Sequence, residues 1–295
     1  MSLSLFLQSI AIGFFPFLSK IHEFIIVKGV GNISQTIRKS IKDALLADTF
    51  NKKIRAKVMA KLGTVFPMSR VLGMIIGFVL LTYLSLVYTF YFCALLVLFV
   101  AIFFFLFYKE KVYKRISWKF SSRAYSRNIK IISLIAFFIS LNFTIAYLPA
   151  FFILANSLSI ETNTLFILFL GSYLISSAFT YWSKNWIDKF GRIKTLFFSI
   201  LGFSIIMFFY AFTVDIVQMF IVLAGVSVFY YIGRIALKTV MMDNTSKPNR
   251  GEQIGFIKSI EGIGDVAGPA IGGFLIEFVS LSSTFVVASA VGIVG

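Results

Sequence analysis

Only one cysteine and one histidine occur among the 295 residues of the chain. Cys93 alone cannot form an intrachain disulfide, and His22 alone excludes a multi-histidine metal site. Acidic residues are also scarce, since Asp and Glu together number 12. No segment matches the phosphate-binding pattern G-x-x-x-x-G-K-S/T, so ATP is not expected as a direct energy source. The sequence therefore predicts no metal, no cofactor and no enzymatic activity.

Apolar residues, in contrast, make up 59% of the chain, and phenylalanine alone occurs 37 times. With a mean hydropathy of +0.92, this composition predicts a multi-pass membrane protein embedded in the lipid bilayer. The net charge of +16 does not indicate a nucleic-acid partner, because the basic residues lie between apolar segments. Met1–Leu18 has neither a basic n-region nor a cleavage site, so it is not expected to be a secretory signal.

Ten apolar spans can be drawn along the chain, and they predict an all-α polytopic fold in the cell (cytoplasmic) membrane. The spans are Leu3–Leu18, Ile21–Ala47, Lys57–Leu81, Leu84–Tyr108, Ile129–Leu154, Thr164–Trp182, Leu196–Thr213, Ile216–Met242, Ile254–Ile276 and Ser283 onward.

Basic residues are concentrated in every second connector between these spans. Arg38–Lys61 and Lys109–Lys130 hold eight Lys and Arg each, Lys184–Lys194 holds four, and Asp243–Lys258 holds three. The turns near Leu81–Leu84, Ser157–Asn163, Val214–Asp215 and Glu277–Ser282 hold none. By the positive-inside rule the basic connectors are cytoplasmic. This alternation supports the number of spans, because one missed helix would break it.

The chain contains one stretch twice, at a constant offset of 195 positions. The offset carries Asp48 onto Asp243, Arg55 onto Arg250 and Gly73 onto Gly268. Six spans, an even number, separate each helix from its copy, so both copies cross the membrane in the same direction. This predicts a parallel repeat about an axis along the membrane normal, as between the two halves of one large transporter class.

The repeat predicts a 6+6 fold of twelve spans. About 66 residues of the second half have no counterpart in the first half, which is enough for two spans and a loop. We therefore expect this chain to contain spans 3 to 12 of the twelve-span fold, with the last one truncated. A genuine start at Met1 is the alternative. The expected domains are an N-terminal bundle (1–108), a basic cytoplasmic linker on the inner leaflet (109–130) and a C-terminal bundle (131–295).

Four short motifs lie in the loops and at the helix ends. Asp188–Lys194 reads DKFGRIK, and Thr36–Asp48 reads TIRKSIKDALLAD, with Arg55 following it. Arg250 repeats that arginine, and Gly264–Gly273 reads GDVAGPAIGG. Together these stretches resemble the loop and helix motifs of the major facilitator superfamily, in particular its drug-efflux-like members.

The resemblance implies a cytoplasmic latch that holds the inner gate shut in the outward-facing state. It assigns Asp188, Gly191 and Arg192 to the loop motif, with Arg55 and Arg250 as loop arginines that an aspartate can pair with. The sequence departs from the family pattern at Lys184, where a glycine usually stands.

Polar residues within the spans predict a substrate cavity, because lipid-facing positions disfavour them. In the second and eighth spans they recur at steps of three and four residues, which places them on one face of each of these two helices. Under the resemblance these helices line the cavity. The predicted cavity residues are Lys28, Asn32, Gln35, Asn142, Tyr147, Ser227, Tyr231 and Arg234.

Only two carboxylates lie deep in the spans. Glu261 and Asp265 are one helical turn apart, Lys258 lies one turn before Glu261, and Arg70 maps by the repeat onto Asp265. We predict that Glu261 or Asp265, with Arg70, serves proton coupling or gating. The alternative is a structural ion pair with Lys258 or Arg70.

The sequence thus predicts a secondary active transporter that moves a small solute by alternating access. We expect it to be proton-coupled, an efflux antiporter and a monomer. The cations Lys28, Arg70 and Arg234 favour an anionic or zwitterionic solute, whereas the efflux-like motifs favour amphipathic drugs. The alternatives are a non-transporting sensor or scaffold with a transporter fold, or a ten-span exporter of another superfamily.

The parallel repeat can be tested by cysteine labelling. In a Cys93→Ser background, Asp48→Cys and Asp243→Cys should both react with a membrane-impermeant maleimide from the cytoplasmic side, because repeat copies share one orientation. Reaction of the two positions from opposite sides would contradict the repeat.

Overall fold

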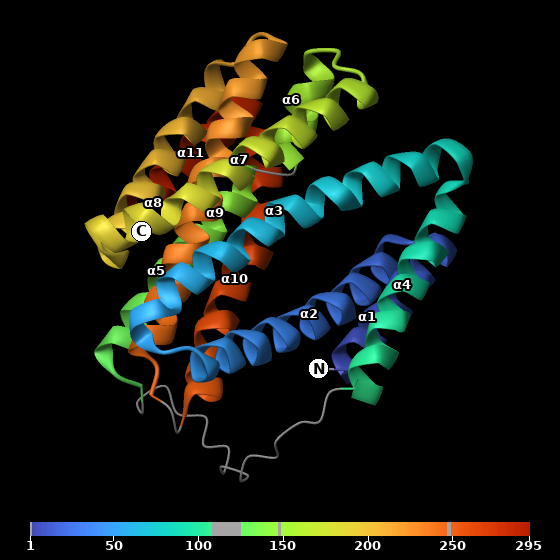
Figure 1. Cartoon of the computed structure of the whole chain (residues 1–295). Coiled ribbons are helices and arrows are strands. Elements are labelled where there is room, and N and C mark those ends of the chain that lie inside the picture. The colour runs from blue at the N-terminus through green and yellow to red at the C-terminus, as the bar shows by residue number, and fades with distance from the viewer. Residues whose placement is uncertain (1, 108–124, 147–148, 247–248) are drawn as a thin grey trace. The chain divides into compact units, whose positions relative to one another are not determined.

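The computed structural model describes residues 2–107, 125–146, 149–246 and 249–295 (Figure 1). Within these ranges the structure is helical and contains no strand, so the predicted all-α class is confirmed. The α-helices are α1 (Ser2–Phe14), α2 (Ile21–Thr49), α3 (Lys52–Tyr83), α4 (Leu86–Phe107), α5 (Arg127–Ala146), α6 (Pro149–Ser157), α7 (Thr162–Phe190), α8 (Arg192–Phe209), α9 (Ile216–Asn244), α10 (Arg250–Phe278) and α11 (Leu281–Val294). Two short 3-10 helices follow α1 and α8, namely η1 (Phe15–Phe17) and η3 (Tyr210–Phe212).

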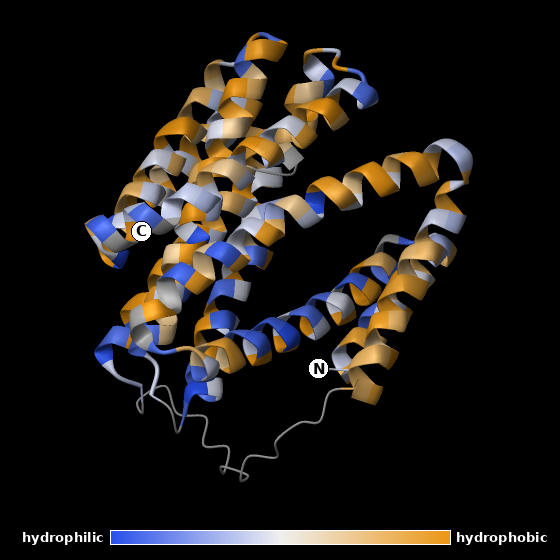
Figure 2. Cartoon of the chain, in the orientation of Figure 1, coloured by the Kyte–Doolittle hydropathy of each residue, from blue (hydrophilic) through white to orange (hydrophobic). Residues whose placement is uncertain are grey.

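Each predicted span falls on one of these helices, the fifth on α5 and α6 together. Six helical segments of the described ranges are long and apolar enough to cross a membrane by length and composition. They are Lys57–Tyr83, Leu86–Phe107, Arg127–Ser157, Thr162–Ile187, Arg192–Phe212 and Ile216–Asn244. The helices α2 and α10 are not among them, because both carry charges along their length. Figure 2 shows these hydrophilic positions on α2 and at many helix ends.

Local chemistry explains where several helices begin and end. Gly191 joins α7 to α8 with a φ of +85°, a backbone conformation that favours glycine, and this fits the tight turn predicted for the loop motif. The carboxylate of Asp215 accepts a hydrogen bond from the backbone N–H of Gln218 (2.8 Å) and caps α9. Ser280 caps α11 in the same way.

The helices group into two compact units that do not follow the chain order. Unit 1 comprises residues 1–45 and 75–125, and unit 2 comprises residues 46–74 and 126–295. The chain thus passes from unit 1 to unit 2 within α2 and back within α3. The predicted bundle boundaries stay a prediction, and most of the predicted linker, residues 109–124, lies outside the described residues.

Unit 1 is organised by the packing of α1 against α4 and α2. The hydroxyl of Ser9 donates to the carbonyl oxygen of Ala94 (2.8 Å), and the rings of Phe15 and Phe90 stack with centroids 5.6 Å apart. The guanidinium of Arg38 on α2 donates to the side-chain oxygen of Gln8 on α1. Polar contacts between helices in an apolar unit restrict their register, because an unpaired partner would be costly to bury.

Unit 2 contains the main hydrophobic core, which lies between α5, α6, α8, α9 and α11. Its largest fully buried side chains include Phe151, Met207, Leu223 and Phe285. On the outer side of the same helices, large apolar side chains such as Ile221 are exposed, here by 64%. An apolar outer surface around an apolar core is the pattern expected of helices in lipid.

Helix α10 packs on α5 through a face of glycines spaced four residues apart. A Cβ on Gly264 would lie 2.7 Å from the carbonyl oxygen of Phe137, and one on Gly272 would meet the carbonyl oxygen of Ile145. At Gly268 the nearest group is the side chain of Thr144, whose hydroxyl donates to the carbonyl oxygen of Gly264 (3.0 Å). Small residues therefore bring the two backbones close together, as the glycine motif predicts.

This close approach predicts that substitution by alanine changes the stability differently at two neighbouring glycines. Gly264→Ala should lower the free energy of unfolding by roughly 1–3 kcal/mol, because backbone atoms of α5 cannot yield easily. Gly262→Ala is the matched control, since a Cβ there meets nothing within 4 Å. The control should be neutral or stabilising by up to about 1 kcal/mol. Thermal melting in detergent measures both, and equal melting temperatures would contradict the packing.

Candidate functional site

Helix α9 carries the predicted polar face into the interior of unit 2. Ser227 and Tyr231 are buried, with 3% and 7% of their surfaces exposed. Among the described residues neither hydroxyl has a hydrogen-bond partner. Arg234 and Lys238 follow on the same face and are half-buried. The spacing of three and four residues places these side chains on one face of α9, and their role in a cavity stays a prediction.

A buried carboxylate joins α9 to α10. Glu261 accepts a hydrogen bond from the guanidinium of Arg234 and another from the ammonium of Lys258, both at 2.6 Å. The side chains of Glu261, Lys258 and Arg234 are 7%, 5% and 18% exposed. Protonation of Glu261 would leave two cations without their anion in a poorly solvated place. The geometry therefore favours the structural alternative for Glu261, an ion pair with Lys258, to which it adds Arg234.

The second carboxylate has different surroundings. Asp265 lies one turn further along α10 and is exposed, and it accepts a hydrogen bond from the hydroxyl of Ser140 on α5. A neutral donor offsets a carboxylate charge less than two cations do. The two predicted coupling acids thus differ in their partners, because Asp265 accepts from a neutral hydroxyl and Glu261 from two cations.

Arg70 on α3 stands between two tyrosine rings. Its guanidinium donates a hydrogen bond to the hydroxyl of Tyr173 on α7 (3.1 Å). Its central carbon lies 5.4 Å from the ring centre of Tyr173 and 5.9 Å from that of Tyr231. The residue is nevertheless exposed. Cation–π contacts thus position the charged group while its side chain stays exposed.

Tyr230 lies beside Arg234 on α9. Its ring centre lies 5.8 Å from the guanidinium of Arg234, and the ring stacks on Phe143 with centroids 4.2 Å apart. We call the five charged residues Arg70, Arg234, Lys258, Glu261 and Asp265 the charged centre. With three cations and two carboxylates, the charged centre has one excess positive charge.

Asn142 on α5 is fully buried, as expected for a residue inside the bundle. Its amide nitrogen donates to the hydroxyl of Ser204 (3.1 Å), and its oxygen has no partner among the described residues. A cavity of about 10 Å³ lies beside it, also lined by Tyr230 and Gly233. This is about the space that a single water molecule needs. The other predicted residue of this segment, Tyr147, lies outside the described residues.

The predicted cavity residues of the first half lie on α2 in unit 1. Lys28 and Asn32 are exposed and Gln35 is half-buried. One face of α2 is therefore polar at these positions, as their spacing predicts. Their role in a substrate cavity stays a prediction.

Two ion pairs lie where the repeat and the loop motif predict charges. Arg192 pairs with Asp243, and Arg250 pairs with Asp48. Arg250 also donates to the carbonyl oxygen of Thr245 (3.4 Å). The second pair joins the arginine of one repeat copy to the aspartate of the other. The side chains of Asp188 and Arg55 lie outside the described residues, so their part in the predicted latch stays a prediction.

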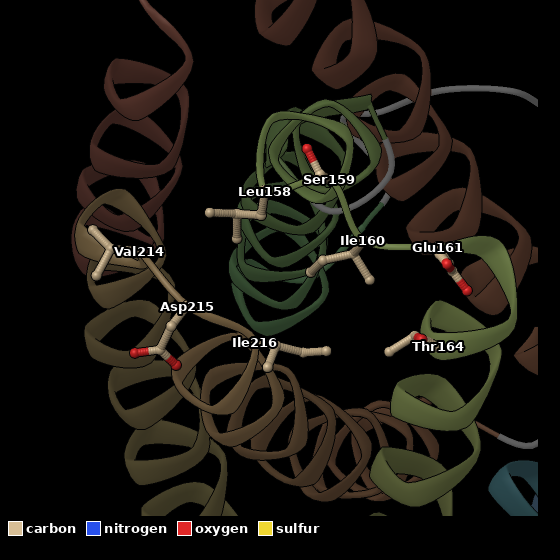
Figure 3. A pocket seen from close by; sticks show the side chains of 8 residues that line it. All are labelled: Leu158, Ser159, Ile160, Glu161, Thr164, Val214, Asp215 and Ile216. Atoms are coloured by element: carbon tan, nitrogen blue, oxygen red, sulfur yellow. The ribbon is translucent and has the colours of Figure 1, made fainter.

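One cavity in unit 2 lies away from the charged centre. Figure 3 shows it between the α6–α7 turn and the start of α9, with a volume of about 330 Å³. Two acidic side chains line it, Glu161 and Asp215, and Asp215 is already engaged as the cap of α9. These turns hold no Lys or Arg, so the positive-inside rule predicts that this cavity opens on the outer side.

Sequence reasoning missed Tyr173, Tyr230 and Ser140. Tyrosine and serine are common in the spans of this chain, which has 12 tyrosines, and no charge distinguishes these three. A signal was present only for Tyr230, which directly precedes the predicted Tyr231 and lies four residues before Arg234.

The buried ion pairs predict that removing the charge of Glu261 destabilises the fold. Glu261→Gln should lower the free energy of unfolding by about 3–5 kcal/mol, because Arg234 and Lys258 lose their shared anion. Glu277→Gln on the same helix is the matched control, since Glu277 is exposed. Thermal melting of the purified chain provides the comparison. If both variants melted at the same temperature, the ion pairs would not stabilise unit 2.

Comparison with known proteins agrees with this architecture. Multidrug resistance protein 2 of Bacillus subtilis (strain 168) is 27% identical over 159 residues. The match covers 53% of this chain, and it spans less than two-fifths (38%) of that relative's length.

Two solved structures show the same fold. The human organic anion transporter MFSD10 (TETRAN) superposes on this chain with a TM-score of 0.82 at 16% identity. The superposition covers 99% of this chain and 74% of the MFSD10 chain. The proton:xylose symporter XylE, bound to 6-bromo-6-deoxy-D-glucose, superposes with a TM-score of 0.77 at 11% identity, over 99% and 76% of the two chains. These identities are low, so the likeness concerns the fold and not the solute.

A family model covers almost the whole chain. The model described as Major Facilitator Superfamily matches residues 1–129 and 132–295. The predicted resemblance is therefore confirmed, and the chain belongs to the major facilitator superfamily.

Proposed function

We propose that this protein is a secondary active transporter that moves a small solute across the cytoplasmic membrane by alternating access. The observation that carries the proposal is the buried carboxylate of Glu261, which pairs with Arg234 and Lys258 inside a unit with an apolar outer surface. Intramembrane charges are costly to bury and commonly mark a path for solutes or ions. Membership of a transporter superfamily supports the same function.

In this proposal two like-oriented bundles rock about a cavity near the bilayer midplane. The two bundles are those that the repeat predicts, and the basic linker joins them. Because one chain supplies both bundles, a monomer is sufficient for transport. The multidrug resistance relative supports efflux as the direction of transport. The ion pairs Arg192–Asp243 and Arg250–Asp48 lie in cytoplasmic connectors and would close the inner side.

Reconstitution tests the proposal directly. The purified chain in proteoliposomes should move at least one of two labelled amphipathic probes, salicylate or tetraphenylphosphonium, faster than protein-free liposomes under an imposed pH gradient. A chain that retains its melting transition but moves neither probe, with the gradient in either direction, would contradict transport and favour a sensor or scaffold.

We assign proton exchange to Asp265, because its side chain is exposed and its hydrogen-bond donor is the neutral hydroxyl of Ser140. Asp265→Asn should abolish the acceleration of flux by a pH gradient and leave exchange without a gradient measurable, because only the proton-accepting group is lost. Glu277→Gln, an exposed acid of the same helix, should keep the wild-type response. The measurement is initial flux at several imposed gradients.

Two results would contradict the assignment of proton exchange to Asp265. If Asp265→Asn and Glu261→Gln both kept the wild-type dependence on the pH gradient, neither deep carboxylate would couple transport to protons. If only Glu261→Gln lost the dependence while remaining folded, the coupling group would be Glu261.

A further inference from the structure

The end of α7 exposes a row of large aromatic side chains. Its members recur at steps of three and four residues, which places them on one face of the helix. We call this row the α7 aromatic face, and it consists of Phe179, Trp182, Trp186 and Phe190. Each is exposed by 37% to 55%, and the rings of Phe179 and Trp182 meet edge to face with centroids 5.8 Å apart. An exposed apolar face of this kind indicates contact with lipid or with another protein.

The position of this face along α7 indicates the membrane interface. The apolar span within α7 ends at Ile187, and the next span begins at Arg192. Both tryptophans of the face lie within the last two turns of the first span, and Asn185 between them is exposed. Tryptophan is enriched at the level of lipid headgroups, because one end of its ring system is apolar and the other is polar. The α7 aromatic face therefore ends in the headgroup region.

The turn that follows this face has an excess of positive charge. Residues 184–194 contain four Lys and Arg and one acidic residue, and the positive-inside rule predicts that they are cytoplasmic. The side chains of Lys184 and Asp188 lie outside the described residues. Arg192 pairs with Asp243 of α9. Counted together with Asp243, four basic and two acidic residues leave an excess of two positive charges.

Two lysines present positive charge beside the aromatic rings. Lys189 lies at the end of α7 and Lys194 in the first turn of α8, on the two sides of Gly191, and both are exposed. The ammonium of Lys189 lies 5.8 Å from the ring centre of Phe190, so the cation adjoins the α7 aromatic face. A lysine stem can lie along apolar surface while its ammonium reaches polar headgroups. The turn thus combines cations with aromatic rings at the level of lipid phosphates.

We propose that the α7 aromatic face, with Lys189 and Lys194, binds an anionic phospholipid of the inner leaflet. The phosphate group lies against the ammonium groups, and the acyl chains lie against the aromatic rings. Charge complementarity selects this occupant, because basic side chains next to a membrane span attract anionic lipids. A second copy of the chain that met the same surface would bring like charges together. This binding goes beyond the proposed transport function and does not depend on it.

Tryptophan quenching by brominated lipids tests the proposal. The chain has three tryptophans, so Trp118→Phe leaves Trp182 and Trp186 as the only ones. The full chain in this background is placed in nanodiscs of phosphatidylglycerol and phosphatidylcholine, of which only one carries bromine on its acyl chains. We expect phosphatidylglycerol to associate with the tryptophans about threefold or more strongly than phosphatidylcholine, because each nearby lysine favours an anionic lipid.

Variants of the two lysines then place the site. Lys189→Gln with Lys194→Gln should reduce the preference for phosphatidylglycerol to about onefold, because the two charges are lost. Lys189→Arg with Lys194→Arg keeps the charges and should keep the preference. The matched control is Arg127→Gln with Lys130→Gln, which removes two exposed charges from α5 and should also keep it. If the double Gln variant does not melt cooperatively, the two single variants decide, each with a smaller loss.

Three results would overturn the proposal. Equal quenching by both brominated lipids would show an interfacial anchor without selectivity for the headgroup. Quenching by neither lipid would show that protein, a second copy or another partner, covers the face. A loss of preference in the α5 control as large as in the Lys189 and Lys194 variant would show general attraction between the protein and the membrane instead of a site.

Discussion

The contact on which unit 2 depends is the carboxylate of Glu261 held between Arg234 and Lys258. All three groups are largely withdrawn from water, so removing one of them would leave a buried charge uncompensated. The contact ties α9 to α10, and the glycine face of α10 ties that helix in turn to α5. Because these three helices are fixed together, the polar face of α9 lies inside the protein instead of in lipid.

The two deep carboxylates have different surroundings. Glu261 has two cations as partners, whereas Asp265 accepts from a serine hydroxyl and is exposed. Arg70 contacts two tyrosines and is also exposed. Under the proposed function, the ion pairs of Glu261 would hold α9 and α10 together and Asp265 would carry the proton.

Much of the fold and part of the candidate site could be predicted from the sequence, because hydropathy and charge act locally along a helix. The helical spans follow from runs of apolar residues, the shared face of Ser227, Tyr231 and Arg234 from their spacing, and the glycine motif of α10 from its resemblance to a family motif. The partner of Arg234 could not be predicted, since Arg234 and Glu261 meet only after two helices pack. The same holds for Tyr173, which only tertiary packing brings to Arg70.

The central claim is that water reaches the polar face of α9 during the working cycle. The most direct measurement is the reaction of Ser227→Cys, in a Cys93→Ser background, with the anionic reagent 2-sulfonatoethyl methanethiosulfonate. Ile221→Cys, on the exposed apolar side of the same helix, is the comparison. The account predicts that Ser227→Cys reacts and that Ile221→Cys, shielded by lipid, does not. Equal inertness of both positions, or reaction of Ile221→Cys alone, would contradict it.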